Sequence, residues 1–241
     1  MFSSRQNSAN ESQASLRARR SQRPFITWTV ATSAMLLAAV DWGGRLAYDR
    51  GNIAAGQVWR LATGHLTHWN ADHLVWDVLM FALLGTMLEG RGRTALTSVL
   101  VLSTAAISAT LWFVEPTVEF YRGLSGIDTA LFTLAALELW GEARGGRRLL
   151  IRAAVGALLA GLLAKLGYEV ATGATLFVDS SSAGFTPLPL VHAVGAGVGV
   201  LVAWSAKLLT RQRRLVSLES GHDQRETDRW SDSQATLIGN L

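Results

Sequence analysis

The chain contains no cysteine, and only 17% of its 241 residues are charged. An ordinary soluble domain has about 25% charged residues. The absence of cysteine excludes a disulfide framework, a thiol nucleophile and a thiolate metal site. Hydrophobic residues make up 49% of the chain although both of its ends are polar, so the middle must be strongly apolar. This composition excludes a disordered protein and disfavours a soluble domain with a single core.

The charged residues are gathered in a few segments rather than spread along the chain. The net charge of +4 would suit a nucleic-acid binder, but several long stretches between the arginine clusters carry no charged residue. This distribution is typical of a membrane protein with several spans. We therefore predict an all-α membrane protein. Its spanning helices are expected near residues 25–40, 73–88, 94–114, 124–140, 149–168 and 185–207.

Polar segments flank this apolar region. We predict a disordered cytoplasmic tail at 1–24, a six-span membrane domain at 25–210, and a polar cytoplasmic tail at 211–241 that is disordered after Leu215. Six spans place both termini on one side of the membrane. On that topology, with the C-terminal tail counted only as far as Arg214, fifteen Lys and Arg residues lie on the side of the termini and four on the other side. The positive-inside rule then predicts cytoplasmic termini in a bacterial-type inner membrane.

Six polar side chains share one predicted depth, in the outer third of the bilayer. They are His73, Asp77, Ser125, Asp128, Lys165 and His192. Ionisable groups inside a membrane are costly and usually face a protein interior or a water-filled cavity. Taken singly, a buried Ser is most often a packing residue, and a lone His most often lies at the interface. Their common depth favours one outward-opening polar cavity.

Four short motifs carry a family resemblance, which covers residues 59–204. Trp59-Arg60 is followed by His68 and, five residues later, by His73, with Asp77 four further on. The other three motifs are Gly85-x-x-x-Glu89, Gly123-Leu124-Ser125-Gly126 and His192-x-x-Gly195-x-x-x-Gly199. In this order and on these spans, they resemble the motifs of the rhomboid intramembrane serine proteases.

The resemblance implies a compact bundle of six helices and a serine endopeptidase that cleaves membrane helices near their outer end. The chain looks most like the rhombosortase branch, whose implied substrates are secreted proteins with a C-terminal sorting helix. Expected partners are transmembrane protein substrates and the lipid bilayer, with no nucleic acid, cofactor or metal, and the oligomeric state is left open. Two competing hypotheses are an inactive rhomboid-like protein that binds membrane helices, and a small transporter or channel with an outer cavity.

The chemistry expected from the residues is a Ser–His dyad. Ser125 would be the nucleophile, with Gly123 and Gly126 letting a substrate backbone approach closely. His192 would act as general base toward the Ser125 hydroxyl and then as acid toward the leaving amine. Gly195 and Gly199 form a small-x-x-x-small face that would let the sixth span approach the fourth.

Oxyanion stabilisation has several candidate donors. The backbone N–H groups of Ser125 and Leu124 lie at the start of a helix, where the dipole favours negative charge. His73 could donate a ring N–H. Asp77 stands where the family usually has Asn and is four residues from His73 on one helix, so the two share a face. Asp77 either accepts a hydrogen bond from His73, the preferred interpretation, or is protonated and itself donates.

The remaining candidates have supporting roles. Asp128 lies three residues after Ser125 and would either orient His192 or form an ion pair with Lys165. Thr129 replaces a Tyr that is common in the family. The residues Trp59, Arg60, His68, Trp69 and Glu89 are expected to be structural. His65 lies near His68, His73 and Asp77, but the chain has no His-Glu-x-x-His motif, so no metal is expected.

Overall fold

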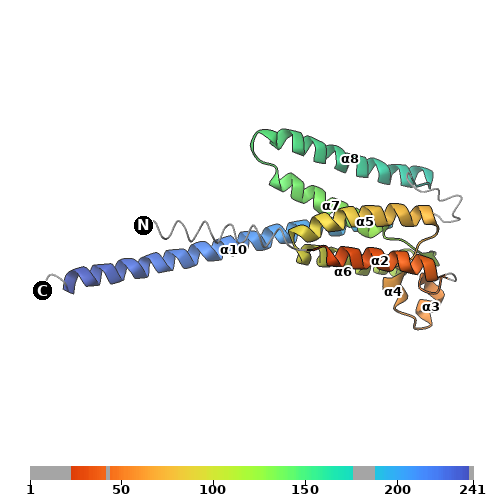
Figure 1. Cartoon of the computed structure of the whole chain (residues 1–241), viewed down its shortest axis with the longest axis horizontal. Coiled ribbons are helices and arrows are strands. Elements are labelled where there is room, and N and C mark those ends of the chain that lie inside the picture. The colour runs from red at the N-terminus through yellow and green to blue at the C-terminus, as the bar shows by residue number, and fades with distance from the viewer. Residues whose placement is uncertain (1–22, 42–43, 176–187, 239–241) are drawn as a thin grey trace. The chain divides into compact units, whose positions relative to one another are not determined.

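The computed structural model describes residues 23–41, 44–175 and 188–238, and these are mainly helical (Figure 1). Each predicted spanning segment contains a helix. These helices are α2 (Phe25–Val40), α5 (Ala71–Arg91), α6 (Arg93–Phe113), α7 (Ser125–Glu142), α8 (Arg148–Thr172) and α10 (Pro189–Ile238). The predicted mainly helical fold is therefore confirmed. Residues 1–22 of the predicted tail at 1–24 and the start of the sixth predicted span lie outside the described residues.

Four helical segments in the described part of the chain are long and apolar enough to cross a membrane. They are Ala71–Arg91, Arg93–Phe113, Gly145–Thr172, which includes the short helix η2 (Gly145–Arg147), and Pro189–Gln212. Helix α2 is apolar but has only 16 residues, and α7 has 18 but is more polar. Bilayer spans need about 17–25 residues. The chain is thus an integral membrane protein, while the count of six spans stays a prediction.

Helix α7 lies among the other helices, and this explains its polar composition. It contacts α5, α6 and α8, and more than half of its residues are buried. Gly195 and Gly199 of α10 pack directly on it: a β carbon at position 199 would lie 2.5 Å from the carbonyl oxygen of Ala130. The expected close approach of these two segments is therefore confirmed. A helix enclosed by protein does not need the apolar surface that lipid contact demands.

The Gly85-x-x-x-Glu89 motif of α5 packs against the start of α2. The buried Glu89 carboxylate accepts hydrogen bonds from the backbone N–H groups of Ile26 and Thr27, at 3.0 and 2.9 Å, and from the Thr27 hydroxyl. A β carbon at Gly85 would meet the Thr27 side chain at 2.8 Å. The carboxylate thus satisfies N–H groups that the start of α2 leaves unpaired, in support of the predicted structural role of Glu89.

The segment between α2 and α5 is folded rather than extended. It contains β1 (Tyr48–Asp49), α3 (Arg50–Ala54), α4 (Arg60–Thr63) and η1 (Gly64–Leu66). Strand β1 pairs antiparallel with β2 (Phe120–Tyr121), a small sheet that the sequence did not indicate. The Arg60 side chain is only 6% exposed and donates to the carbonyl oxygens of Gly44 and Ala47. Arg60 therefore holds this loop together, whereas Trp59 is 52% exposed.

The described residues fall into two units, the first ending at Val202 and the second covering Ala203–Leu241. The sequence predicts disorder after Leu215, but α10 continues to Ile238. The difference has a local reason, because this segment contains no proline and only one glycine before Ile238, and is rich in residues with good helix propensity. All the candidate site residues belong to the first unit.

Candidate active site

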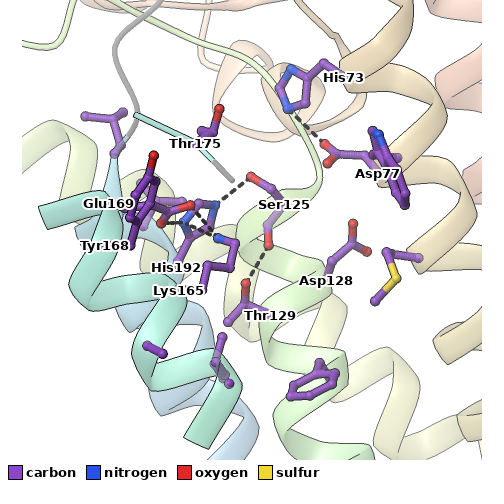
Figure 2. Close-up of a pocket in the computed structure, with 18 of the residues that line it drawn as sticks. His73, Asp77, Ser125, Asp128, Thr129, Lys165, Tyr168, Glu169, Thr175 and His192 are labelled. Atoms are coloured by element: carbon purple, nitrogen blue, oxygen red, sulfur yellow. Dashed lines mark hydrogen bonds and ion pairs between the residues drawn. The ribbon is translucent and has the colours of Figure 1, made fainter. Parts of the chain in front are cut away.

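A cavity of about 810 Å³ opens between α5, α7, α8 and the first turns of α10 (Figure 2). All six polar residues that the sequence placed at one depth line it, namely His73, Asp77, Ser125, Asp128, Lys165 and His192. The prediction of one shared cavity is therefore confirmed. Much of the remaining lining is apolar, with Trp76, Met80, Phe132 and Leu162 among its members.

Ser125 and His192 are in direct contact in this cavity. The His192 Nε2 atom lies 3.0 Å from the Ser125 hydroxyl oxygen, although the two residues are 67 positions apart in the chain. Ser125 is the first residue of α7, and His192 lies in the first turn of α10. A distance of 3.0 Å allows an imidazole nitrogen to accept the hydroxyl proton.

The Ser125–His192 contact depends on the close packing of α7 and α10 at the neighbouring residues. A β carbon at Gly126 would lie 2.6 Å from a methyl carbon of Val191, the residue before His192. The glycine therefore lets the start of α10 approach α7 closely enough for the Ser125–His192 hydrogen bond. Gly126 acts here through helix packing, in addition to any space that it leaves for a substrate.

Glu169 is a site residue that the sequence analysis missed. Its side chain is fully buried on α8, and Oε2 lies 2.7 Å from the second ring nitrogen of His192, Nδ1 (Figure 2). Its other oxygen, Oε1, accepts from Lys165 Nζ at 2.6 Å. The predicted fifth span ends at 168, one residue before Glu169. The i,i+4 spacing of Lys165 and Glu169 was the signal that would have placed both on one helical face.

Asp128 makes neither of the contacts that we expected for it. Among the described residues, His192 and Lys165 both bind Glu169 instead. Asp128 is buried and lines the cavity, but its Oδ1 has no hydrogen-bond partner in the described part of the chain. Both alternatives for Asp128 are therefore wrong in this structure. The physical reason is that Lys165 and Glu169, four residues apart on α8, share one face of that helix and both reach His192.

Asp77 lies at the centre of a second polar cluster. Its Oδ2 is 3.2 Å from Nε2 of His73 and 3.2 Å from Nε2 of His68, and it accepts from the backbone N–H of Leu124 at 2.7 Å. The contact with His73 agrees with our preferred interpretation of Asp77. His68, expected only to shape the loop, belongs to this cluster as well.

The Leu124 N–H group is thus already occupied. We expected it to be a candidate oxyanion donor, but it points to the Asp77 carboxylate. That expectation is wrong for this conformation, and the backbone N–H of Ser125 stays the candidate at the start of α7.

The turn before α7 approaches this cluster very closely. Gly123 has φ +123°, in the region that favours glycine, and a β carbon there would lie 2.7 Å from the His73 ring. The Tyr121 hydroxyl donates to the Gly123 carbonyl oxygen at 3.0 Å, and burial raises the pKa of this hydroxyl above its usual value. Tyr121 therefore remains a hydrogen-bond donor and fixes the turn that places Ser125.

The Thr129 side chain has a local partner. Its hydroxyl donates to the backbone carbonyl of Ser125 at 2.8 Å, within the first turn of α7. Thr129 does not contact His192 in the way expected of the Tyr found in many rhomboids. The ring of His192 is instead held from α8, by Glu169.

Comparison with known proteins assigns the class. The family model described as the rhomboid domain matches residues 55–208, so the chain belongs to the rhomboid family. The chain is similar to the rhomboid protease GlpG of Enterobacter sp. (strain 638), with 27% identity over 196 residues. That match covers 78% of this chain and 61% of the GlpG chain. This chain therefore aligns with about three-fifths of the length of that relative.

Proposed function

We propose that this protein is an intramembrane serine endopeptidase that uses a Ser125–His192 dyad. The observation that carries the proposal is the 3.0 Å contact between His192 Nε2 and the Ser125 hydroxyl, inside a cavity lined largely by apolar side chains. Membership of the rhomboid family and similarity to a rhomboid protease support it.

The reaction follows from the positions of these groups. The Ser125 Oγ attacks the scissile carbonyl carbon while His192 Nε2 takes the hydroxyl proton. The negative charge that develops on the carbonyl oxygen is stabilised by the Ser125 backbone N–H and the positive end of the α7 dipole. The protonated His192 then gives its proton to the leaving amine. Water, deprotonated by the same imidazole, hydrolyses the acyl-enzyme and regenerates Ser125.

The substrate class is a transmembrane helix or a C-terminal sorting helix of a membrane-anchored or secreted protein. A cavity bounded by Trp76, Met80 and Phe132 suits an apolar segment that has unwound locally to expose its backbone. The sorting-helix substrate rests on the motifs at 59–77 and on Asp77, which resemble the rhombosortase branch. Cleavage near the outer end of the helix follows from the predicted cytoplasmic termini.

Labelling with a fluorophosphonate in native membranes tests the dyad. The Ser125 oxygen forms a bond to phosphorus, fluoride leaves, and His192 takes the proton, so only an activated serine reacts quickly. We expect wild-type protein to be labelled at Ser125, and the Ser125→Ala and His192→Ala variants to be inserted and folded but not labelled. Ser98→Ala, on α6 and outside the cavity lining, is the matched control and should label normally.

A comparison of membrane proteins in cells with and without this chain identifies the substrate. Proteins that keep an uncleaved terminal helix only when the chain is absent or carries Ser125→Ala are the substrates. A wild-type chain that neither labels nor changes any membrane protein would favour the inactive, helix-binding alternative and overturn the protease assignment.

A further inference from the structure

We propose that Glu169 is a positioning residue that completes a Ser125–His192–Glu169 triad, with Lys165 balancing its charge. The inference rests on the proposed dyad and extends it to a third helix. Glu169 and Lys165 lie on α8, Ser125 on α7 and His192 on α10 (Figure 2). The Glu169 carboxylate is fully buried and lies 2.7 Å from His192 Nδ1, on the opposite side of the ring from Ser125.

The first role of Glu169 is to select the tautomer of His192. A carboxylate can only accept, so the 2.7 Å contact requires a proton on Nδ1. Neutral imidazole carries one ring proton, and Nε2 therefore faces the Ser125 hydroxyl as an acceptor. This is the tautomer that a general base needs.

Lys165 favours the opposite tautomer. Its ammonium group lies 3.3 Å from His192 Nδ1 and is a donor only, so a hydrogen bond to that nitrogen would leave the ring proton on Nε2. The shorter distance, 2.6 Å, joins Lys165 to Glu169. Lys165 is thus bound more closely by Glu169 than by His192.

The second role of Glu169 is electrostatic. When His192 takes the Ser125 proton it becomes an imidazolium, and a buried carboxylate 2.7 Å away stabilises that cation. A fully buried carboxylate alone would be costly, and the Lys165 ammonium group offsets its charge in the resting state. The Glu169 carboxylate therefore stabilises the imidazolium form of His192, and the Lys165 ammonium group destabilises it.

The contact between Glu169 and His192 also explains why a charged residue is buried on α8. Along α8 only Val155 and Glu169 are buried, and the other side chains are wholly or partly exposed. A charged residue is a surprising choice for one of two buried positions unless it has a partner there. The hydrogen bond with His192 supplies that partner and connects α8 to α10 at the site.

The test uses the full chain in liposomes and measures the rate of Ser125 labelling by a fluorophosphonate from pH 5 to pH 10. We expect Glu169→Gln to lower the plateau rate at least about 100-fold, since amide replacement of a triad carboxylate costs about 10,000-fold in the best-studied case. Glu169→Asp, which keeps the charge, should recover part of the loss. Glu138→Gln on α7, which removes the carboxylate that pairs with Arg91, is the matched control and should label like wild type.

The pH profile separates a positioning role from a merely structural one. Loss of the Glu169 charge makes the imidazolium less stable, so the acid limb of the Glu169→Gln profile should move to lower pH. Loss of the ammonium group in Lys165→Met should move the same limb to higher pH. A charge at this distance typically shifts a titration by about 1–3 units. Melting temperatures show which variants are folded.

Each outcome decides the proposal. Opposite shifts of the acid limb, with a low plateau rate for Glu169→Gln, support the triad. A folded Glu169→Gln variant with the wild-type rate and profile would overturn it and leave the dyad intact. If Glu169→Gln does not fold, Lys165→Met alone must show its shift, and an unmoved profile overturns the proposal. If the wild-type protein is never labelled, the result would instead contradict the proposed protease function itself.

Discussion

Gly195 of α10 lies directly against the backbone of Gly126 on α7. A β carbon at position 195 would be only 2.0 Å from the Gly126 carbonyl oxygen, and no flexible side chain is available to move aside. The contact is three residues from His192 and one residue from Ser125. The spacing of the two helices and the geometry of the candidate dyad are thus set at the same place.

Replacing Gly195 by alanine should therefore disrupt both folding and activity. The helices must separate or slide to admit the methyl group, and a shift of about 1 Å near a reacting group can cost about 100-fold in rate. We expect a lower melting temperature and greatly reduced labelling of Ser125. Gly197→Ala is the matched control, because a β carbon there meets no atom within 4 Å. Equal behaviour of the two variants would contradict the packing argument.

Asp77 is expected to act through its acceptor oxygen rather than through its charge alone. Asp77→Asn keeps an oxygen that can accept from the Leu124 N–H, whereas Asp77→Leu leaves that buried donor unpaired. An unsatisfied buried N–H costs about 1–3 kcal/mol. The Leu variant should therefore unfold at a clearly lower temperature than the Asn variant, with a larger loss of labelling. Equal melting temperatures would show that the hydrogen bond to Leu124 contributes little.

Asp128→Asn should be nearly silent. The carboxylate contacts neither His192 nor Lys165, so its removal breaks no ion pair at the candidate dyad. We expect a melting temperature no lower than that of the wild type and a labelling rate within about threefold, because the change removes a buried negative charge that is costly without a partner. A large loss of labelling rate in a folded Asp128→Asn variant would favour Asp128 over Glu169 as the third member of the triad.

The helices could be predicted from the sequence because apolar runs of helical length are visible in one dimension. The predicted segment 94–114 differs by one residue at each end from α6, which covers Arg93–Phe113. The fifth predicted segment ends at 168, four residues before α8 ends at Thr172. That error removed Glu169 from the spanning helix.

The site could be predicted in part. Ser125, His192, His73 and Asp77 line one cavity as expected, since depth in a bilayer follows from topology. The choice of Asp128 as a partner for His192 used a spacing within one helix, because the sequence shows only such local relations. The rotation of α8 against α10 depends on packing between distant segments, and no local pattern encodes it. Strands β1 and β2 have two residues each, too few for a periodic signal.

The orientation of the chain is predicted from the charge asymmetry of its connecting segments. Because fifteen Lys and Arg residues up to Arg214 fall on the side of the termini and four on the other side, both termini should be cytoplasmic. Protease added to intact spheroplasts should leave tags at either end uncut and should cut them once the membrane is permeabilised. Digestion of the tags from the outside would show that the orientation is the reverse of the predicted one. The candidate dyad would then lie near the cytoplasmic surface.

The stability of the protein should fall with acid through His65. This ring is buried in η1, its Nε2 lies 3.2 Å from the Ser108 hydroxyl, and burial lowers the pKa of His65 to about 4. In the unfolded chain, His65 takes up a proton near its usual pKa of 6.5, whereas in the folded chain it stays neutral until about pH 4. Stability is therefore lost as pH falls between these values, by up to about 1.4 kcal/mol per pH unit.

Replacing His65 by glutamine removes this titration and keeps a donor for Ser108. We expect the melting temperature of wild-type protein to fall more steeply than that of His65→Gln between pH 6.5 and pH 4.5, even if the variant is less stable at pH 7.5. Other groups titrate in the same range, but they are common to both proteins and cancel in the difference. Parallel pH curves for the two proteins would show that the folded chain protonates His65 as readily as the unfolded one.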